Sequence, residues 1–351
     1  MQKNIFKNKK ILITGCTGFT GGWLILYFKL MGAIIYGYSK KPPFKNSLFQ
    51  TLNLKKKIYF QEGDVLDDDN LRKFYKKSNP DFVFHLAANA IVKDCYKYPA
   101  DAFQSNTIGT LNLMEIIRTS KTKKKISVNI ITTDKVYQNS EIKKYFTEDD
   151  ILGGEDPYSA SKVCAEIICL SYYKSFLKNK NISINILRSG NIIGGGDWSN
   201  YRLIPDIANS LKTKKILKIR NPNHTRPWQH IFDVINSYAL IASKKYTLQK
   251  FNFEIWNIGP LTKKNYSVKN IIKMIEKKIS KKIVIKLIKS KNVEKKFLNL
   301  NSTKLFKKLN IKNKLNTAES IDLTFDWYLK SFKTKKDNFS ENQLIKYLDY
   351  R

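Results

Sequence analysis

The chain has 351 residues, of which 42% are hydrophobic and 13% aromatic. This is the composition of a folded protein with one large or two modest domains, and it excludes a disordered chain. The net charge of +35 is of the kind found in nucleic-acid-binding proteins. However, the lysines are spread along the whole length, no basic stretch is interleaved with aromatics in an RNA-binding pattern, and only seven of the 64 basic residues are Arg. We therefore expect no nucleic-acid partner, and a basic, non-catalytic RNA-binding protein stays a remote alternative.

No apolar run approaches the roughly 20 residues that a membrane helix requires. The first residues, "MQKNIFKNKK", carry charge without an apolar signal core. We expect a soluble, cytoplasmic protein that has no membrane partner. Its four cysteines, Cys16, Cys95, Cys164 and Cys169, lack C-x-x-C or His-flanked spacing. This argues against a disulfide framework and against a zinc site, so no metal is expected.

Short apolar runs alternate with amphipathic segments through the first half of the chain. The predicted strands are 10–15, 33–39, 57–65, 81–88, 127–133 and 183–191, and the predicted helices are 20–31, 67–78, 100–119 and 158–178. This alternation predicts an α/β fold with a Rossmann-like, doubly wound parallel sheet. After residue 191 the rhythm breaks into "GGGDW" and "NPNHTRPWQH", which predict a smaller mixed α/β lobe.

The stretch "TGCTGFTGG" follows the first predicted strand directly and opens the first predicted helix. Its glycines Gly15, Gly18 and Gly21 form G-x-x-G-x-x-G, which lets the backbone turn tightly and approach a pyrophosphate at the helix N-terminus. We therefore predict a dinucleotide site. The second strand ends in "YGYSKK", with Ser39 and Lys40 where an acidic ribose ligand is usual, so these residues leave NAD and NADP both open.

Two further patterns carry chemistry. "YSASK" places Tyr158 and Lys162 four residues apart on a predicted helix, so that both lie on one face and the ammonium favours the phenolate. Such a phenolate can accept a proton from a hydroxyl while hydride leaves the same carbon. The apolar run before "TTDK" ends in Thr133, Asp134 and Lys135, at the carboxyl end of a strand, where open α/β sheets bind their ligands.

The motifs "TGCTGFTGG", "HLAA", "SNTIGTLNLMEIIR", "TTDK" and "YSASK" together resemble extended short-chain dehydrogenases that act on nucleotide sugars, the NAD-dependent epimerase/dehydratase family. The resemblance spans about residues 8–330. "DPYSASKVCAE", "SGNIIGGGDW", "YRLIPDI" and "IRNPNHTRPWQHIFDV" resemble the CDP-glucose 4,6-dehydratase branch of that family. This implies a lyase that uses NAD and acts on CDP-glucose, in the biosynthesis of deoxysugars for surface polysaccharides such as O-antigen. It also implies a homodimer formed through helices near 100–119 and 158–178.

The resemblance assigns residues to three tasks. The residues assigned to the cofactor are Gly15, Thr17, Gly18, Phe19, Thr20, Gly21, Asp64, Val65, Leu86, Ala87, Ala88, Asn106, Tyr158 and Lys162. The residues assigned to catalysis are Thr133, Asp134, Lys135, Tyr158 and Lys162. The nucleotide diphosphate is assigned to Asn191, Arg202 and Arg226. By contrast, we interpret His85 as a buried core histidine, and Trp228 as either a pocket wall or a core residue.

The implied reaction has three steps. Tyr158 deprotonates the C4 hydroxyl as hydride leaves C4, the new ketone acidifies C5, and water is lost across C5 and C6 before hydride returns to C6. Asp134 is the expected acid for the leaving hydroxyl, with a pKa raised by burial. Lys135 replaces the glutamate of most sugar-nucleotide 4,6-dehydratases and is the expected C5 base or enolate stabiliser, and Thr133 donates to the C4 oxygen. A 4-epimerase or another 4,6-dehydratase of the same fold is the alternative.

The expected domain organisation follows from these assignments. An NAD-binding domain covers 1–190, and a segment at about 230–260 returns to it. A nucleotide-sugar lobe is formed by 191–229 and 261–335, and 336–351 form a C-terminal tail. Within the lobe, "VEKKFLNLNSTK" matches the family pattern only loosely, because Lys296 and Asn301 stand where histidine and aspartate are usual. The resemblance therefore assigns no nucleotide contact to this stretch, including Glu294.

Overall fold

The computed structural model describes residues 4–140, 144–248, 251–261, 265–289, 295, 297–333 and 338–349. Glu294 and Lys296 lie outside these residues. The strands are β1 (Lys10–Thr14), β2 (Ile34–Ser39), β3 (Tyr59–Glu62), β4 (Phe82–His85), β5 (Ile126–Thr133), β6 (Tyr145–Phe146), β7 (Ile182–Ser189), β8 (Ile192–Ile193), β9 (Leu217–Ile219), β10 (Thr225–Arg226), β11 (Gln229–His230), β12 (Phe253–Ile258), β13 (Tyr266–Ser267), β14 (Ile285–Leu287) and β15 (Asn299–Leu300).

The α-helices are α1 (Phe19–Leu30), α2 (Leu48–Thr51), α3 (Asp68–Ser78), α4 (Val92–Lys97), α5 (Pro99–Phe103), α6 (Gly109–Thr119), α7 (Pro157–Tyr172), α8 (Leu203–Thr213), α9 (Ile231–Thr247), α10 (Val268–Ile279), α11 (Thr303–Leu309), α12 (Thr317–Lys333) and α13 (Phe339–Asp349). Short 3₁₀ turns are η1 (Leu54–Lys57) and η3 (Asp134–Val136), and π-helical turns are η2 (Gln104–Ile108) and η4 (Tyr173–Leu177). None of the helices in the described ranges combines the length and the apolar character needed to span a membrane.

The chain divides into two compact units. Unit 1 comprises Met1–Gln138, Ile151–Arg188 and Ile235–Trp256, and unit 2 comprises Asn139–Asp150, Ser189–Val234 and Asn257–Arg351. Residues 139–150 thus belong to unit 2, whereas the sequence-based boundary at 190 placed them in the first domain. The reason is local pairing, because β6 forms a parallel pair with β15 and the Glu148 carboxylate accepts the N–H of Asn257 at 2.9 Å.

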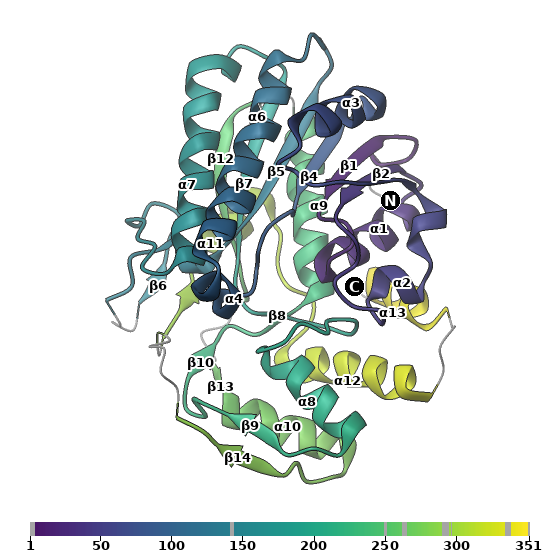
Figure 1. Ribbon diagram of the computed structural model, residues 1–351, viewed down its shortest axis with the longest axis vertical. Coiled ribbons are helices and arrows are strands. Elements are labelled where there is room, and N and C mark those ends of the chain that lie inside the picture. Colours follow the sequence, from purple (N-terminus) through teal and green to yellow (C-terminus); the bar gives the residue numbers. More distant parts are fainter. Residues whose placement is uncertain are drawn as a thin grey trace. The chain divides into compact units, whose positions relative to one another are not determined.

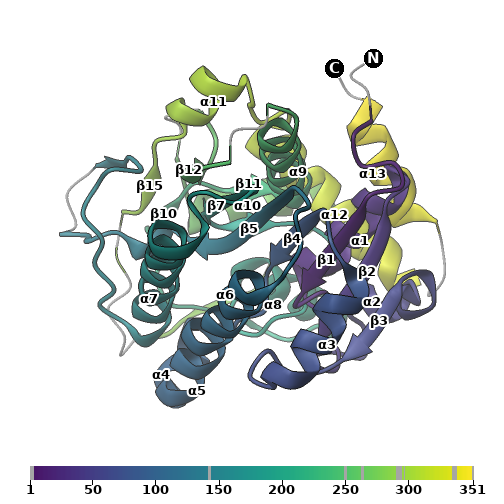
Figure 2. The ribbon, with the colours of Figure 1, turned by 90° about the horizontal axis from the view of Figure 1, so that it is seen from above.

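Unit 1 contains a seven-stranded sheet in the order β12-β7-β5-β4-β1-β2-β3. β1 lies between β2 and β4, and the pairs β1–β2, β1–β4, β2–β3 and β4–β5 are all parallel. Helices α3, α6 and α7 cover one face, and α1 and α9 lie on the other (Figures 1 and 2). The predicted doubly wound α/β sheet is confirmed, and every one of the six predicted strands is present.

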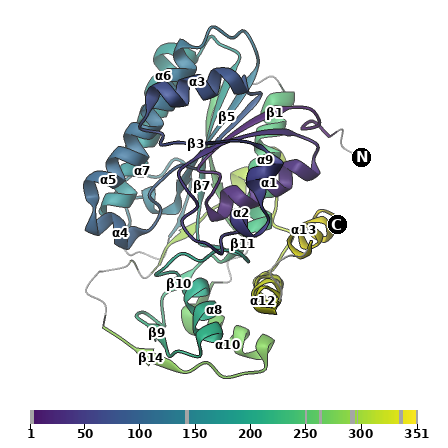
Figure 3. The ribbon, with the colours of Figure 1, turned by 45° about the vertical axis from the view of Figure 1, so that its right-hand side comes forward.

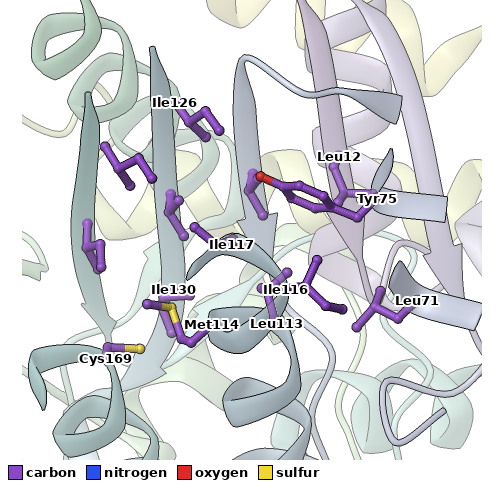
Figure 4. Close-up of a cluster of buried hydrophobic side chains, with 14 of the residues drawn as sticks. Leu12, Leu71, Tyr75, Leu113, Met114, Ile116, Ile117, Ile126, Ile130 and Cys169 are labelled. Atoms are coloured by element: carbon purple, nitrogen blue, oxygen red, sulfur yellow. The ribbon is translucent and has the colours of Figure 1, made fainter. Parts of the chain in front are cut away.

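Side chains that alternate along each strand supply the cores on the two faces. In β4, Val83 joins the core under α3 and α6, which Figure 4 shows around the labelled residues of these helices. Phe82 and Phe84 point the other way, where the Phe84 ring lies 5.0 Å from that of Phe28 in α1 and the Phe82 ring 4.7 Å from that of Tyr246 in α9. Both faces of the central strands are therefore covered, as their near-continuous apolar sequences require.

Two predicted helices are interrupted by π-helical turns. The segment expected as one helix over 100–119 consists of α5, η2 and α6, and that over 158–178 consists of α7 followed by η4. Figure 3 shows α4 and α5 lying beside α7. In η2 the side chain of Asn106 is turned inward and fully buried. A π turn is frequently associated with a functional site, and η2 lies between two predicted site segments.

In unit 2 the residues of the "GGGDW" motif pack against helix α12. Trp198 of this motif packs edge-on against Tyr328 of α12, with ring centroids 5.2 Å apart, and against Trp327. A Cβ on Gly195 would overlap the Trp327 side chain, so only glycine fits there. The hydroxyl of Tyr328 donates to the backbone oxygen of Asp197. The motif is thus the docking point for α12.

The C-terminal segment is a docked helix rather than the expected tail. The buried carboxylate of Asp233 accepts the backbone N–H groups of Lys314 and Leu315 and the hydroxyl of Tyr347 in α13. The Lys314 ammonium donates to the carbonyls of Tyr347 and Leu348, which are among the last residues of α13. A helix C-terminus favours a cation in this position.

Candidate active site

The glycine loop has the geometry of a dinucleotide cradle. Gly15 has a φ of +70°, and a Cβ there would lie 2.6 Å from the backbone nitrogen of Ala87. A Cβ on Gly21 would lie 2.6 Å from the carbonyl oxygen of Gly15. Gly18 is the N-cap of α1 and contributes no side-chain cap, and the first turn has no acidic residue. The N-terminus of α1 is therefore suited to an anionic group such as a pyrophosphate.

The residues around the loop are tied to the ends of β2 and β3. The Thr17 hydroxyl bonds Ser39 Oγ at 2.7 Å and donates to the carbonyl of Lys40. The Lys40 ammonium pairs with the carboxylate of Asp64 at 2.5 Å, and Val65 lies buried against Gly109 at the start of α6. Phe19 and Thr20 are the first two residues of α1 and are half-buried.

The end of β4 is fixed by hydrogen bonds to β1. Leu86 N–H donates to the Thr14 carbonyl, Ala87 N–H points to the Thr14 hydroxyl, and Ala88 follows. His85 bonds Thr14 Oγ1 at 2.7 Å through Nδ1 and the Thr110 hydroxyl through Nε2. Burial, with a smaller effect of Lys162, lowers the His85 pKa to about 3, so the ring is neutral. The interpretation of His85 as a core residue is confirmed.

Asn106 connects the loop after β4 to α7. Its amide oxygen accepts the N–H of Asn89 at 2.7 Å, and its amide nitrogen donates to the Asn89 carbonyl and to Ser161 Oγ. The amide is thus occupied by protein groups. Asn106 as a cofactor ligand stays a prediction, while its contacts give it the role of holding Asn89 against α7.

Helix α7 presents Tyr158 and Lys162 at its N-terminal end. Asp156 caps the helix through the N–H groups of Tyr158 and Ser159, in a capping box completed by Ser159, and Pro157 occupies the first turn. Tyr158 and Lys162 are both largely buried, and the Lys162 ammonium donates to the carbonyl of Ile131 at 3.0 Å. The ammonium therefore lies against β5 two residues before Thr133.

Burial controls the charge of Lys162. Desolvation lowers its pKa to about 8, and the carboxylate of Glu166, one turn further along α7, opposes this by favouring the charged form. A cation close to its pKa at physiological pH is characteristic of a functional site.

At the end of β5 the chain makes the turn η3. Thr133 Oγ1 donates to Asp134 Oδ1 at 3.2 Å and accepts the N–H of Lys135 at 3.3 Å. Asp134 is only 2% exposed, whereas Lys135 is half-buried. Because η3 contacts α7, unit 1 brings the predicted catalytic residues of β5 and α7 together. The raised pKa expected for Asp134 stays a prediction.

The three residues predicted to hold a diphosphate lie in unit 2. Arg202, the N-cap of α8, pairs with the carboxylate of Asp197 at 3.1 Å. Arg226 is buried at the end of β10, and its guanidinium donates to the carbonyl of Thr225. Asn191 precedes β8, and its carbonyl accepts the N–H of Gln229.

Two other residues of unit 2 that the sequence singled out have structural contacts. Trp228 is a core residue, because it is buried and its indole N–H donates to the Tyr266 carbonyl. Asn301 bonds Phe146 through its backbone N–H and caps the N–H of Thr303 with its side chain. Among the residues that the structure describes, no His, Cys, Asp or Glu side chains cluster as metal ligands.

The sequence analysis missed Glu166 and Arg188, which form a bidentate ion pair buried beneath the site. Two signals were available. Glu166 lies four residues after Lys162, on the same helical face. Arg188 is the only charged residue of its predicted strand, and such a charge requires a partner when buried.

The glycine loop after β1, the strand order of the sheet and the Tyr158–Lys162 pair beside the end of β5 define a Rossmann-like protein of the extended short-chain dehydrogenase type. The sequence model of a family described as "GDP-mannose 4,6 dehydratase" matches residues 12–324. The chain belongs to this family, which confirms the predicted epimerase/dehydratase relationship.

Curated relatives include both dehydratases and epimerases. A "CDP-glucose 4,6-dehydratase" of Salmonella typhimurium is 38% identical over 265 residues, which are 74% of this chain and 73% of that protein. A "dTDP-D-glucose 4,6-dehydratase" of Dictyostelium discoideum is 32% identical, over 71% of this chain and 60% of that protein.

Solved structures share the fold over most of the chain. The UDP-glucuronic acid 4-epimerase of Bacillus cereus, in complex with UDP-glucuronic acid and NAD, matches with a TM-score of 0.78 and 25% identity over 92% of this chain and 99% of that chain. The dTDP-glucose 4,6-dehydratase of Bacillus anthracis, in complex with NAD, matches with a TM-score of 0.78 and 21% identity over 94% and 99%.

The depressed pKa of Lys162 predicts that Lys162→Met stabilises the fold. A pKa that falls from 10.5 in the unfolded chain to about 8 corresponds to about 3 kcal/mol against the buried ammonium at pH 7. Between pH 8 and 10.5 the unfolded chain binds more protons, so the wild type gains stability as pH rises. Denaturant unfolding of Lys162→Met at pH 7 is expected to show up to about 3 kcal/mol more stability, with the difference shrinking towards pH 10.5.

The control is Lys174→Met, which removes an exposed lysine just beyond α7 and is expected to change stability by less than about 0.5 kcal/mol at every pH. A Lys162→Met variant that is less stable than the wild type at pH 7, or a difference independent of pH, contradicts the assignment of a buried, destabilised ammonium.

Proposed function

We propose that the protein is an NAD-dependent hydro-lyase that converts CDP-glucose to CDP-4-dehydro-6-deoxyglucose. The observation that carries the proposal is the end of β5, where Thr133, Asp134 and Lys135 follow directly after the strand against which the Lys162 ammonium is bound. Unit 1 thus contains an acid (Asp134), a base (Lys135) and the Tyr158–Lys162 pair that assists hydride transfer. These groups suit an oxidation followed by an elimination. Membership of a dehydratase family and the 38% identity to the Salmonella enzyme support it.

The residues present fit a bound NAD. The cradle between Gly15 and Ala87 that any Cβ would fill, and the N-terminus of α1 with neither an acidic residue nor a side-chain cap, suit its pyrophosphate. Gly18, Thr17, Phe19, Thr20 and Gly21 surround this point, with Leu86 and Ala88 at the end of β4 and Asp64 and Val65 at the adenosine end. When bound, the nicotinamide supplies an acceptor for the C4 hydride and returns it at C6, so there is no net redox change. NADP is the alternative cofactor, since Ser39 and Lys40 at the end of β2 tolerate a 2′-phosphate.

Tyr158 accepts the proton of the C4 hydroxyl in the first step. Lys162 holds a positive charge one helical turn away, which favours the phenolate over the neutral phenol. Because the pKa of Lys162 is about 8, this help is available below that pH and is lost above it. The Thr133 hydroxyl donates to the C4 oxygen and steadies it as the carbonyl forms.

Elimination of water needs a base at C5 and an acid at the C6 oxygen. Lys135 in its neutral form removes the C5 proton, or in its charged form stabilises the enolate that results. Asp134 in its protonated form donates to the departing C6 hydroxyl, which leaves as water. The proton taken from C5 by Lys135 returns to C5 when hydride is added at C6, which gives the 4-keto-6-deoxy sugar. The burial of Asp134 fits an acid that is protonated when the reaction requires it.

In unit 2 we assign the nucleotide diphosphate to Asn191, Arg202 and Arg226. A planar guanidinium meets two phosphate oxygens at once, and the Asp197 carboxylate fixes the orientation of Arg202. In a chain with seven arginines among 64 basic residues, arginine at these positions indicates that the geometry matters.

A 4-epimerase or another nucleotide-sugar 4,6-dehydratase is the alternative, because solved epimerases share the fold over 92% of the chain. Epimerisation needs no acid at C6 and no base at C5, so Asp134 and Lys135 favour dehydration.

We further propose a cytoplasmic homodimer formed through α5, η2, α6 and α7. Phe103, Ile108 and Ile167 are exposed by 38%, 42% and 55% on these helices, and a dimer would bury them. Sedimentation at twice the chain mass of 40.9 kDa tests this.

Purified protein with NAD and CDP-glucose is expected to form a 4-keto-6-deoxy sugar, detected by its absorbance in alkali. CDP-glucose should be turned over faster than dTDP-glucose and GDP-mannose measured in parallel. Product from dTDP-glucose but not from CDP-glucose would contradict the assignment of cytidine as the nucleoside of the substrate. A 4-epimer in place of a keto-deoxy sugar would make the reaction wrong.

Lys135→Met is expected to separate the two halves of the reaction. The variant should still reduce NAD with CDP-glucose, so that the absorbance of the reduced cofactor builds up, while formation of the keto-deoxy product falls by about 100-fold or more. Lys174→Met serves as the control and should behave as the wild type. Near-normal product formation by Lys135→Met would exclude Lys135 from the elimination step.

A further inference from the structure

The turn that carries the proposed acid and base is bound at both of its ends by one buried ion pair. The turn, residues 133–136, is here called the β5-end segment. Just before it, the Thr132 hydroxyl donates to Glu166 Oε1 at 2.7 Å. Just after it, the Tyr137 hydroxyl accepts a hydrogen bond of 2.8 Å from Arg188 Nη1. Glu166 and Arg188 are bound to each other through Nε and Nη2 of the guanidinium.

These four side chains are almost completely buried, with exposed fractions of 5% for Thr132, 3% for Tyr137, 3% for Glu166 and 1% for Arg188. They come from three separate parts of unit 1: Glu166 from α7, Arg188 from β7, and Thr132 and Tyr137 from the chain on either side of the β5-end segment. Burial by itself would lower the pKa of Arg188, but the hydrogen bonds and charge of Glu166 outweigh this and raise it, so the guanidinium stays charged. An ion pair in such surroundings is strongly directional, because few other partners can replace either group.

Glu166 also belongs to the face of α7 that carries the proposed catalytic pair. Tyr158, Lys162 and Glu166 follow at intervals of four residues, so they lie in one row along the helix. Glu166 is therefore connected to both ends of the β5-end segment, directly through Thr132 and by way of Arg188 through Tyr137. The pair links the position of the acid and base to the position of the phenol and ammonium.

We propose that Glu166 and Arg188 are positioning residues that hold the β5-end segment in register with Tyr158 and Lys162 and keep a negative charge beside the Lys162 ammonium. This inference rests on the proposed function, since it assigns the pair a task in the same reaction. Neither residue contacts the sugar in this account, and both act through the groups that they hold.

The charge beside Lys162 comes from Glu166. Besides Tyr158, whose phenolate it is proposed to favour, the titratable groups that act on Lys162 or on which it acts are Cys169 on α7, Cys95 on α4 and His85 on β4. The Arg188 guanidinium is paired with Glu166. Burial raises the pKa of Cys95 to about 11 and that of Cys169 above its usual range, and His85 is neutral. Near neutral pH these three are uncharged, so within this group Glu166 alone counteracts the desolvation of the ammonium.

The first experiment removes the two ties and leaves the ion pair in place. Thr132→Val replaces one hydroxyl with a methyl group of similar size, and Tyr137→Phe removes the other hydroxyl. We expect kcat to fall by about 10- to 100-fold with KM within about twofold, because the reacting groups are misplaced while binding in unit 2 is unchanged. Amide hydrogen exchange over residues 133–138 should become faster. The control is Tyr173→Phe, which deletes a hydroxyl bonded to the Phe251 carbonyl and should change neither quantity.

The second experiment tests the charge. Glu166→Gln keeps an acceptor for Thr132 but removes the carboxylate, so the Lys162 ammonium loses its stabilising neighbour and its pKa falls. The alkaline limb of kcat/KM should move to lower pH, whereas Glu166→Asp, which keeps the charge, should leave that limb in place. A purely structural role predicts lower activity with an unmoved limb. If Glu166→Gln does not fold, Glu166→Met with Arg188→Met replaces both members of the pair by apolar side chains. The net charge is then unchanged and both ties are lost, so kcat and amide exchange over residues 133–138 in this variant test the positioning role.

The outcomes separate this inference from the proposed function. A wild type that turns over no nucleotide sugar overturns the proposed function, and hydrogen exchange in the hydroxyl variants then still tests the ties. A wild type that is active, with Thr132→Val/Tyr137→Phe equal to it in kcat and in exchange, overturns the positioning role. An alkaline limb that does not move in Glu166→Gln overturns the electrostatic role.

Discussion

Parallel pairing of β1, β4 and β5 is the constraint on which the site depends. Strands that run parallel end at the same edge of the sheet, so the glycine loop after β1, the small residues after β4 and the polar turn after β5 lie along one edge. Each strand has its own local reason to stop there. Gly15 turns the chain after β1 with a positive φ, and Thr133 begins a 3₁₀ turn after β5. The core of the sheet therefore fixes the position of this edge, and the proposed functional residues lie in the loops that follow the strands there.

The buried polar groups of the proposed site lower the stability of unit 1. A buried ammonium at Lys162, a buried carboxyl at Asp134 and the ion pair beneath them stand where apolar side chains would fold at lower cost. Helix α7 has a capping box at Asp156 that stabilises its N-terminal end. Its buried face can therefore carry the polar groups of Tyr158, Lys162 and Glu166. Such local departures from a stability optimum are expected where function is located.

The sequence predicted the strands of the sheet, but it did not predict the π turn, the C-terminal helix or the buried ion pair. Strands such as 127–133 and the glycine loop are visible because apolar runs and glycines are local signals. The π turn at η2 was invisible, because one inserted residue leaves the helical composition of 100–119 unchanged. Helix α13 was read as a tail, because its docking depends on Asp233, more than 100 residues earlier. The partnership of Glu166 with Arg188 likewise needs the fold, since nothing in the spacing of the two residues pairs them.

The central claim is that hydride leaves C4 and returns to C6 of the same sugar, with water lost in between. CDP-glucose labelled with deuterium at C4 tests it directly, with the product analysed by NMR and mass spectrometry. The account predicts deuterium in the C6 methyl group of a 4-keto product, without transfer to unlabelled molecules in a mixed incubation. Deuterium that stays at C4 of an epimerised sugar, or that is lost to solvent, contradicts it.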